Sequence, residues 1–267
     1  FYFFIRINSR ILNKHLQIHE QDHFLLISDS YVIHGGLSAS QYQNGSADCF
    51  KQNPHTFRSS NRSSRGEYLP YPVLVVGPSK AGTSSIDNLF RGSGIVTRHY
   101  DNCLTTGKDY RCGICIKKSI ETGLPPLKTC GGTFTNAWTQ IDYTDYFPEH
   151  LLQYKTNILC YWPQIQALDA IHRENPTATF LLNYRDVDSW ISSVRRWGNL
   201  AHRLSMCPFF EGEATDENLR KFFCDHVMRV RRFVRDNPSH ALVEVNIEDP
   251  LAGEHLAKVF KGVNASY

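Results

Sequence analysis

The sequence predicts an α/β fold, a three-layer sandwich in which helices cover both faces of a central parallel β-sheet. Short apolar, β-branched runs alternate along the chain with segments of helical periodicity, the pattern of repeated strand–helix units. These runs are apolar at consecutive positions, as in parallel strands that are buried on both faces. The 267 residues, 41% of them hydrophobic, suffice for one large domain or two small ones.

The chain divides into two regions at about residue 67. Residues 1–67 mix short apolar runs with a polar, Ser- and Asn-rich stretch, and we expect an irregular N-terminal segment or linker. Residues 68–267 carry the regular strand and helix patterns and are predicted to form one domain. Because the chain starts with Phe1 and stops at Tyr267, just after a helical pattern, we expect this domain to be truncated at its C-terminus.

The first strand–helix unit follows directly. "VLVVG", residues 73–77, predicts a buried strand, and apolar residues on one face predict a helix over 82–90. Residues 101–135 are rich in Cys, Gly and Thr and are predicted to be a loop insertion. A further helix is expected to begin near Pro163, because proline fits the first turn of a helix.

The second half of the domain repeats the alternation. "TATFLLNYR" predicts a buried strand, and "DVDSWISSVRRWGNL" predicts a helix with acidic residues at its N-terminus. The clearest amphipathic helix comes next, then the strand "ALVEVNI", then a last helix with Gly262 as its C-cap. In order, these elements cover residues 177–185, 186–200, 216–236, 241–247 and 251–262.

The turn after the first strand has the character of a phosphate-binding loop. Gly77 and Gly82 are spaced as in the nucleotide-triphosphatase loop G-x-x-x-x-G-K-[ST], but Thr83 replaces its lysine, and Lys80 lies inside the loop. Small residues and free backbone N–H groups at a helix N-terminus bind anions. No apolar strand ending in an Asp suited to Mg²⁺ is evident, so we expect a bound phosphate without a metal-bound triphosphate. The alternative is an ordinary Gly-rich turn with a solvated lysine.

A second motif follows the later strand at 177–185. Arg185 ends that strand, and Ser193 comes eight residues later, two turns into the helix, with Ser192 as an adjacent alternative. An arginine can bind a phosphate through two hydrogen bonds. The alternative for Arg185 is a structural ion pair with Asp186 or Asp188.

Together the two motifs resemble those of the sulfotransferases that use 3′-phosphoadenosine 5′-phosphosulfate, whose fold is of the P-loop nucleotide-hydrolase type. The likeness covers roughly residues 70–267 and is greatest to a branch found in algae and other microbial eukaryotes. It implies that a loop segment holds the 5′-phosphosulfate and that Arg185 and Ser193 hold the 3′-phosphate. The loop residues concerned are Lys80, Ala81, Gly82, Thr83, Ser84 and Ser85.

The resemblance also implies an activity. A sulfuryl group would pass to a hydroxyl of an acceptor, either a carbohydrate or a small molecule, with no metal required. Lys80 would stabilise the leaving phosphate.

The catalytic base is left open among His99, Asp101 and Asp142. Carbohydrate sulfotransferases use a carboxylate some twenty residues beyond the loop lysine, and Asp101 lies twenty-one beyond Lys80. Small-molecule sulfotransferases use a histidine near the distance of Asp142. Each of the three could instead be a surface or capping residue.

Four of the eight cysteines, Cys103, Cys112, Cys115 and Cys130, lie within 28 residues. They could form disulfides, hold zinc through the C-x-x-C pair and its neighbours, or remain free thiols. Cys160, Cys207 and Cys224 could supply a further pair. The cysteines favour an oxidising compartment such as the Golgi lumen, with the cytoplasm as the alternative. Weak support comes from three glycosylation sequons, at Asn44, Asn61 and Asn264.

Several function classes are disfavoured. No basic run of five residues occurs and the net charge is only +3, so nucleic acid is not an expected partner. No run of eighteen apolar residues predicts a membrane span. Two alternatives to the sulfotransferase remain. A P-loop kinase would need Mg²⁺ and a lysine where Thr83 stands, and a non-catalytic relative would keep the nucleotide fold without the reaction.

Overall fold

The computed structural model describes residues 49, 57–59, 68–104, 111–145 and 159–265. The chain separates into two compact units, Phe1–Gly36 and Leu37–Tyr267, and every described residue belongs to the second. Most of the predicted irregular segment 1–67 therefore lies outside the described residues. Two parts of that segment are described, Cys49 and a short strand, and both attach to the domain that follows.

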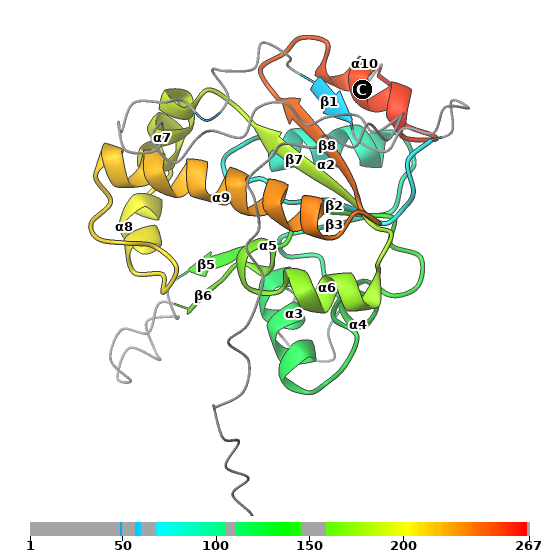
Figure 1. Ribbon diagram of the computed structural model, residues 1–267, viewed down its shortest axis with the longest axis horizontal. Coiled ribbons are helices and arrows are strands. Elements are labelled where there is room, and N and C mark those ends of the chain that lie inside the picture. The colour runs from blue at the N-terminus through cyan, green and yellow to red at the C-terminus, as the bar shows by residue number, and fades with distance from the viewer. Residues whose placement is uncertain (1–48, 50–56, 60–67, 105–110, 146–158, 266–267) are drawn as a thin grey trace, which may run out of the picture. The chain divides into compact units, whose positions relative to one another are not determined.

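A central sheet organises the domain (Figure 1). Its strand order is β1-β8-β7-β2-β4-β3, and all neighbours are parallel except β1, which runs antiparallel to β8 at one edge. The predicted parallel sheet is confirmed. The strands are β1 (Phe57–Ser59), β2 (Val73–Val75), β3 (Thr97–His99), β4 (Ala137–Gln140), β7 (Thr179–Tyr184) and β8 (Ala241–Asn246). Two further strands, β5 (Tyr143–Asp145) and β6 (Leu159–Tyr161), pair antiparallel with each other.

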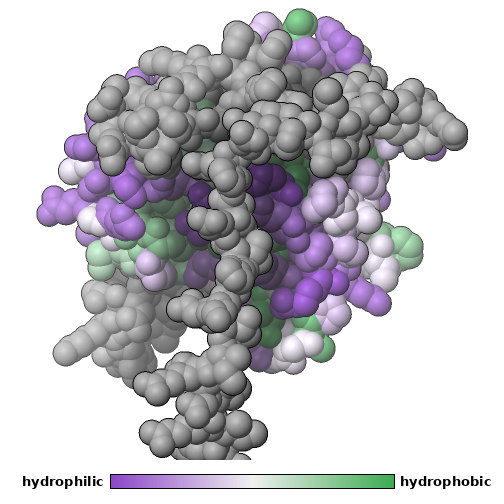
Figure 2. Space-filling model, viewed as in Figure 1, coloured by the Kyte–Doolittle hydropathy of each residue, from purple (hydrophilic) through white to green (hydrophobic). Residues whose placement is uncertain are grey.

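Helices cover both faces of the sheet. Each buried strand presents apolar side chains to both faces, because successive side chains of a strand point to opposite faces. Val73 and Val75 pack with α2 (Thr83–Gly92) and α10 (Ala252–Val259). Leu74 and Val76 pack with the other helices, of which α9 and α6 lie in front of the strands in Figure 1. These are α3 (Cys112–Glu121), α4 (Pro126–Gly131), α5 (Pro163–Gln166), α6 (Leu168–Glu174), α7 (Val187–Arg196), α8 (Leu200–Ser205) and α9 (Asp216–Asp236). Figure 2 shows mostly hydrophilic residues on the described part of this side.

The boundaries of helix α9 agree with the sequence prediction, whereas other predicted helices end or break at different residues. Helix α9 spans Asp216–Asp236, as predicted, and the Thr215 side chain accepts a hydrogen bond from the Asn218 N–H at its start. The helix predicted near Pro163 is broken in two at Ala167, whose φ is −132°. The helix predicted over 186–200 ends at Arg196, and α8 begins at Leu200. Gly262 lies in a turn with φ +87° rather than at the C-cap, which is Phe260.

The Cys-rich stretch 101–135 is not the loop insertion predicted from its composition, because it contains α3 and α4. Two of its glycines serve close packing. A β-carbon on Gly113 would lie 2.7 Å from the Tyr143 side chain, and one on Gly131 would lie 2.5 Å from the Trp138 ring. Close packing therefore accounts for Gly113 and Gly131, whereas Gly123 and Gly132 have φ of +71° and +75°, which favours glycine.

All eight cysteines form disulfides, so the zinc and free-thiol alternatives are wrong. Two disulfides close α3 and its neighbours, one joins β6 to the segment after α8, and one joins residue 49 to α9. The pairs are Cys103–Cys112, Cys115–Cys130, Cys160–Cys207 and Cys49–Cys224. The further pairing expected among Cys160, Cys207 and Cys224 is Cys160–Cys207, and Cys224 pairs instead with Cys49.

The disulfides should stabilise the protein more when they close longer loops, with the logarithm of the loop length. Replacing Cys160 and Cys207 by Ser opens a 47-residue loop and should cost about 4 kcal/mol in the free energy of unfolding. The matched Cys103/Cys112 double variant opens a 9-residue loop and should cost about 2.5 kcal/mol. Urea denaturation measures both losses. Thiol titration of the denatured, unreduced wild type should find no free thiol, and any stoichiometric thiol would contradict the pairing.

Candidate active site

The predicted site residues gather at one edge of the sheet. The carboxyl ends of the parallel strands meet there, and ligands of open α/β sheets bind at this edge. Strand β2, which delivers the Gly-rich loop, lies between β7 and β4. Arg185 follows β7 and Asp142 follows β4, so both flank the loop. His99 ends β3, the strand beyond β4, and Asp101 follows it.

The Gly-rich loop is clamped by a side chain of the neighbouring strand. Asn183 of β7 is fully buried, and its Oδ1 accepts a hydrogen bond from the Gly77 N–H at 3.0 Å. Its Nδ2 donates to the Ala81 carbonyl oxygen at 2.6 Å. Only glycine fits at position 77, since a β-carbon there would lie 2.0 Å from the Asn183 carbonyl oxygen. One amide thus fixes both ends of the loop.

The loop opens the N-terminus of α2 to a ligand. Gly82 is the N-cap residue with φ +85°, no side chain caps the helix, and its first turn carries no acidic residue. Ser84 and Ser85 are exposed beside these backbone N–H groups, while Ala81 and Thr83 are buried. Such an uncapped helix start, with hydroxyl groups around it, is suited to an anion.

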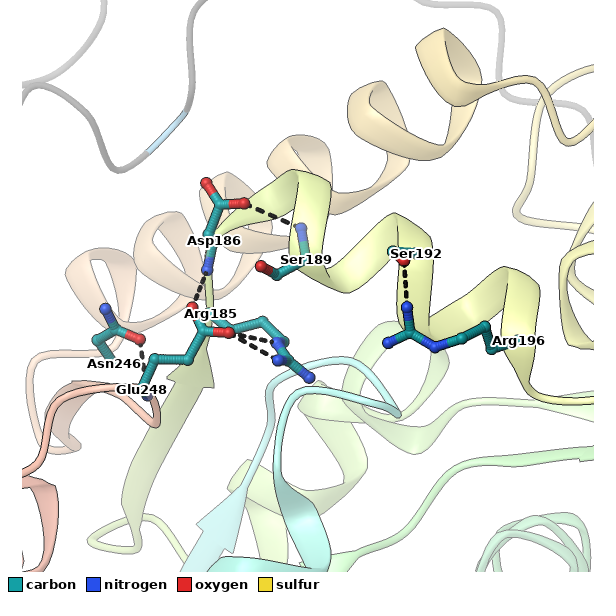
Figure 3. A network of polar contacts seen from close by, with 7 residues as sticks. All are labelled: Arg185, Asp186, Ser189, Ser192, Arg196, Asn246 and Glu248. Atoms are coloured by element: carbon teal, nitrogen blue, oxygen red, sulfur yellow. Dashed lines mark hydrogen bonds and ion pairs between the residues drawn. The ribbon is translucent and has the colours of Figure 1, made fainter.

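Helix α7 contacts the loop along one face. Trp190 is buried and its indole N–H donates to the Ser79 carbonyl oxygen at 2.9 Å. Seven residues further on, at the C-cap of α7, Trp197 lies under Lys80, whose Nζ is 3.5 Å from the ring centroid. Ser193 is three residues after Trp190 and four before Trp197, so it lies on this loop-facing side. Ser192 instead accepts a hydrogen bond from Arg196 (Figure 3), which favours Ser193 of the two serines.

Arg185 forms an ion pair, but with neither partner that the sequence suggested. Its Nε and Nη2 donate to Glu248 Oε1 at 3.0 and 2.6 Å (Figure 3). Asp186 caps α7 through the Ser189 N–H, and Asp188 pairs with Arg220. The expected pairing with Asp186 or Asp188 is therefore corrected to Glu248, which follows β8.

Lys80 has a strained backbone and a perturbed charge. Its φ of +70° is uncommon for a residue with a side chain. Partial burial, and secondarily the positive charge of Arg185, lower the pKa of Lys80. The influence of Arg185 on this pKa indicates that the cations of the two motifs lie near each other.

Asp142 is connected to the loop through one intermediate. The Thr83 hydroxyl donates to Gln140 Oε1 at 3.0 Å, and Gln140 Nε2 donates to Asp142 Oδ2 at 3.2 Å. The carboxyl is 4% exposed. Burial raises the pKa of Asp142 to about 6, although hydrogen bonds from Gln140 and Gln164 oppose the shift. A carboxyl with such a pKa is ionised at neutral pH yet able to accept a proton.

His99 belongs to a separate network. Thr139 donates its hydroxyl proton to Asp87 Oδ1 at 2.8 Å, so the hydroxyl oxygen accepts from His99 Nδ1–H at 3.1 Å. Burial lowers the pKa of His99, more than the charge of Asp87 raises it. His99 is partly buried and Asp101 is exposed, and in the described part of the chain neither forms a hydrogen bond with residues 77–85.

Three residues that shape this site, Asn183, Gln140 and Glu248, were not predicted from the sequence. A signal existed for Asn183, because it is a polar residue inside the apolar run of β7. Gln140 likewise ends the mostly buried strand β4. For Glu248 no local signal exists, since its position beside Arg185 depends on the pairing of β7 with β8.

The buried carboxyl of Asp142 should destabilise the protein at neutral pH. A folded-state pKa of about 6, above the ordinary carboxyl value of 3.8, means that stability from this group is present below pH 4 and is lost as pH rises through 6. Asp142→Asn should therefore raise the free energy of unfolding above pH 6, by about 3 kcal/mol at most, and change little at pH 4. The exposed Asp101→Asn is the matched control. An Asp142→Asn variant less stable than wild type at pH 7.5 would contradict the prediction.

Comparison with known proteins agrees with this geometry. No curated protein and no solved structure matches the chain. In the described residues, no helix is long and apolar enough to cross a membrane, and no group of His, Cys, Asp or Glu side chains is arranged to hold a metal ion. Residues 72–206, which carry both motifs, match the family described as sulfotransferase domain. That span is half of the chain, and the chain therefore belongs to the sulfotransferase domain family, whose function is of the sulfotransferase type.

Proposed function

We propose that the protein transfers a sulfuryl group from 3′-phosphoadenosine 5′-phosphosulfate to a hydroxyl group of an acceptor. The observation that carries the proposal is the direct contact between the two anion-binding elements. The loop before α2 and the β7–α7 unit are joined through Asn183, Trp190 and Trp197. This arrangement supports a ligand with two separate anionic groups, one at each element.

The donor would bind across both elements. The N-terminal amides of α2, with the hydroxyls of Ser84 and Ser85, would hold the 5′-phosphosulfate. Arg185 and Ser193 would hold the 3′-phosphate, which ADP and ATP lack. Thr83 is buried and donates to Gln140, so we assign it to orienting Gln140 as well as to lining the loop.

The reaction would be an in-line displacement at sulfur. The acceptor oxygen forms a bond to sulfur while the bond from sulfur to the bridging phosphate oxygen breaks. The acceptor proton passes to a base, and the electron pair of the broken bond stays on the phosphate, where negative charge develops. Lys80 would leave the Trp197 ring and stabilise that charge. Positioning and electrostatics would supply most of the rate enhancement.

Asp142 is the base that we favour. Strand β4 neighbours β2 directly, whereas His99 lies one strand further out. The hydrogen-bond chain through Gln140 ties the carboxylate to Thr83, and its pKa of about 6 suits proton acceptance near neutral pH. His99 and Asp101, the other two candidates, have the weaker geometric support.

The acceptor class and compartment are also proposals. Trp197 is 58% exposed, and its ring face would be uncovered when Lys80 turns to the phosphate. Such an amphipathic aromatic surface is suited to a carbohydrate. The disulfides support folding in an oxidising lumen, such as that of the Golgi, and Asn264 of one sequon is exposed.

Nucleotide binding tests the donor. Isothermal titration calorimetry should show that 3′-phosphoadenosine 5′-phosphate binds at least about tenfold more tightly than ADP, because only the former contacts Arg185. Arg185→Ala should weaken the 3′-phosphorylated nucleotide about 10- to 100-fold and leave ADP unchanged. Arg232→Ala, which removes an exposed arginine of α9, is the matched control. Equal affinity for both nucleotides, unaltered by Arg185→Ala, would leave only a generic phosphate loop.

Rate measurements test the base. Transfer from radiolabelled donor to a pool of oligosaccharides and phenols should fall at least about 100-fold in Asp142→Asn, with nucleotide affinity retained. In wild type, kcat/KM should rise with pH through about 6, as the carboxyl of Asp142 ionises. Asp101→Asn and His99→Gln should each lose less than about tenfold. A large loss in His99→Gln instead would move the base to that residue.

A further inference from the structure

Glu248 occupies an anion-binding position at the start of α7. Its Oε1 accepts from Arg185 Nε and Nη2, and its Oε2 accepts from the Asp186 backbone N–H at 3.1 Å (Figure 3). Two carboxylate oxygens thus receive three donors, one of them from the backbone at the start of α7. Phosphate oxygens bind to the same kinds of donor at helix N-termini and arginines.

The sheet holds Glu248 in this place. Tyr184 of β7 is in register with Asn246 of β8, and the Ile247 N–H continues the ladder to the Tyr184 carbonyl oxygen at 2.8 Å. The Glu248 N–H then donates to Asn246 Oδ1 at 3.0 Å. Arg185 and Glu248 therefore both come shortly after the paired ends of β7 and β8. The pairing of these two strands brings the two residues together.

The carboxylate and a 3′-phosphate would compete for one guanidinium. The proposed function, on which this inference rests, assigns the 3′-phosphate to Arg185. We propose that Glu248 is an internal anion that occupies the 3′-phosphate position, and that a 3′-phosphorylated nucleotide binds by displacing it from Arg185 and from the Asp186 N–H. Glu248 thereby weakens retention of the product nucleotide and returns to Arg185 when the product leaves.

Displacement is feasible because the pair is near solvent. The side chains of Arg185 and Glu248 are 24% and 33% exposed. A partly exposed ion pair contributes little free energy, and its members can regain hydration when separated. A ligand that must first displace Glu248 shows an affinity reduced in proportion to the fraction of molecules in which Arg185 is unpaired.

Glu248→Gln tests the competition, since the amide keeps the size and removes the charge. Calorimetry should show 3′-phosphoadenosine 5′-phosphate binding about tenfold more tightly to this variant than to wild type. ADP, which has no 3′-phosphate, should bind both equally. Glu254→Gln removes a charge from an exposed residue of α10 and should change neither affinity. Stopped-flow measurement should place the gain in a slower dissociation rate.

A second arm uses inorganic phosphate, independently of any nucleotide. Phosphate should raise the thermal midpoint of Glu248→Gln more than that of wild type, and the added Arg185→Ala change should abolish the difference. Weaker or unchanged binding of the 3′-phosphorylated nucleotide to Glu248→Gln, in a protein where Arg185→Ala does weaken it, would overturn the inference and make Glu248 a positioning residue for Arg185. If wild type shows no preference over ADP, the proposed function fails and the phosphate arm decides alone. An Arg185-dependent phosphate effect would then support a masked anion site, and its absence would overturn it.

Discussion

The buried amide of Asn183 is the interaction on which the site depends. It accepts from the first residue of the loop and donates to the fifth, and the strand that carries it ends directly before Arg185. Strand β7 therefore fixes the shape of one anion-binding element and presents the other. Because the amide is fully buried, leaving either half unpaired would cost more than an ordinary hydrogen bond contributes. The separation of the two elements is thus set by the sheet rather than by mobile loops.

The same arrangement places the cations of Lys80 and Arg185 near each other, and neighbouring side chains interact with each of them. Arg185 lowers the pKa of Lys80, which indicates repulsion between the two cations. Each has a substitute partner, the ring face of Trp197 for Lys80 and the carboxylate of Glu248 for Arg185. An anionic ligand would replace Trp197 and Glu248 as the partners of the two cations. Binding at this edge of the sheet would therefore exchange one set of interactions for another.

Sequence reasoning predicted the parts that depend on contiguous residues. The loop with Lys80, the spacing of Arg185 and Ser193, and the boundaries of α9 follow from local patterns of glycine, charge and helical periodicity. Strands β3 and β4 were missed because three polar residues in β3 and two apolar followed by two polar residues in β4 give no apolar run. The disulfide pairing could not be deduced, since spacing alone does not select among partners. The contact of Glu248 with Arg185 could not be predicted either, because it exists only through the order of strands in the sheet.

Two features of the site destabilise the folded protein, and a merely structural turn would not need either of them. Lys80 has a left-handed backbone, φ +70°, where glycine would be unstrained. Asp142 buries a carboxyl whose raised pKa makes the folded state less stable at neutral pH. Both lie at the carboxyl edge of the sheet, next to β2 or within its loop. Destabilising choices that cluster at one place are characteristic of catalytic sites, where strain and perturbed ionisation serve the reaction. A non-catalytic relative would gain stability by replacing both residues, and their presence therefore favours a protein that performs transfer over one that only binds.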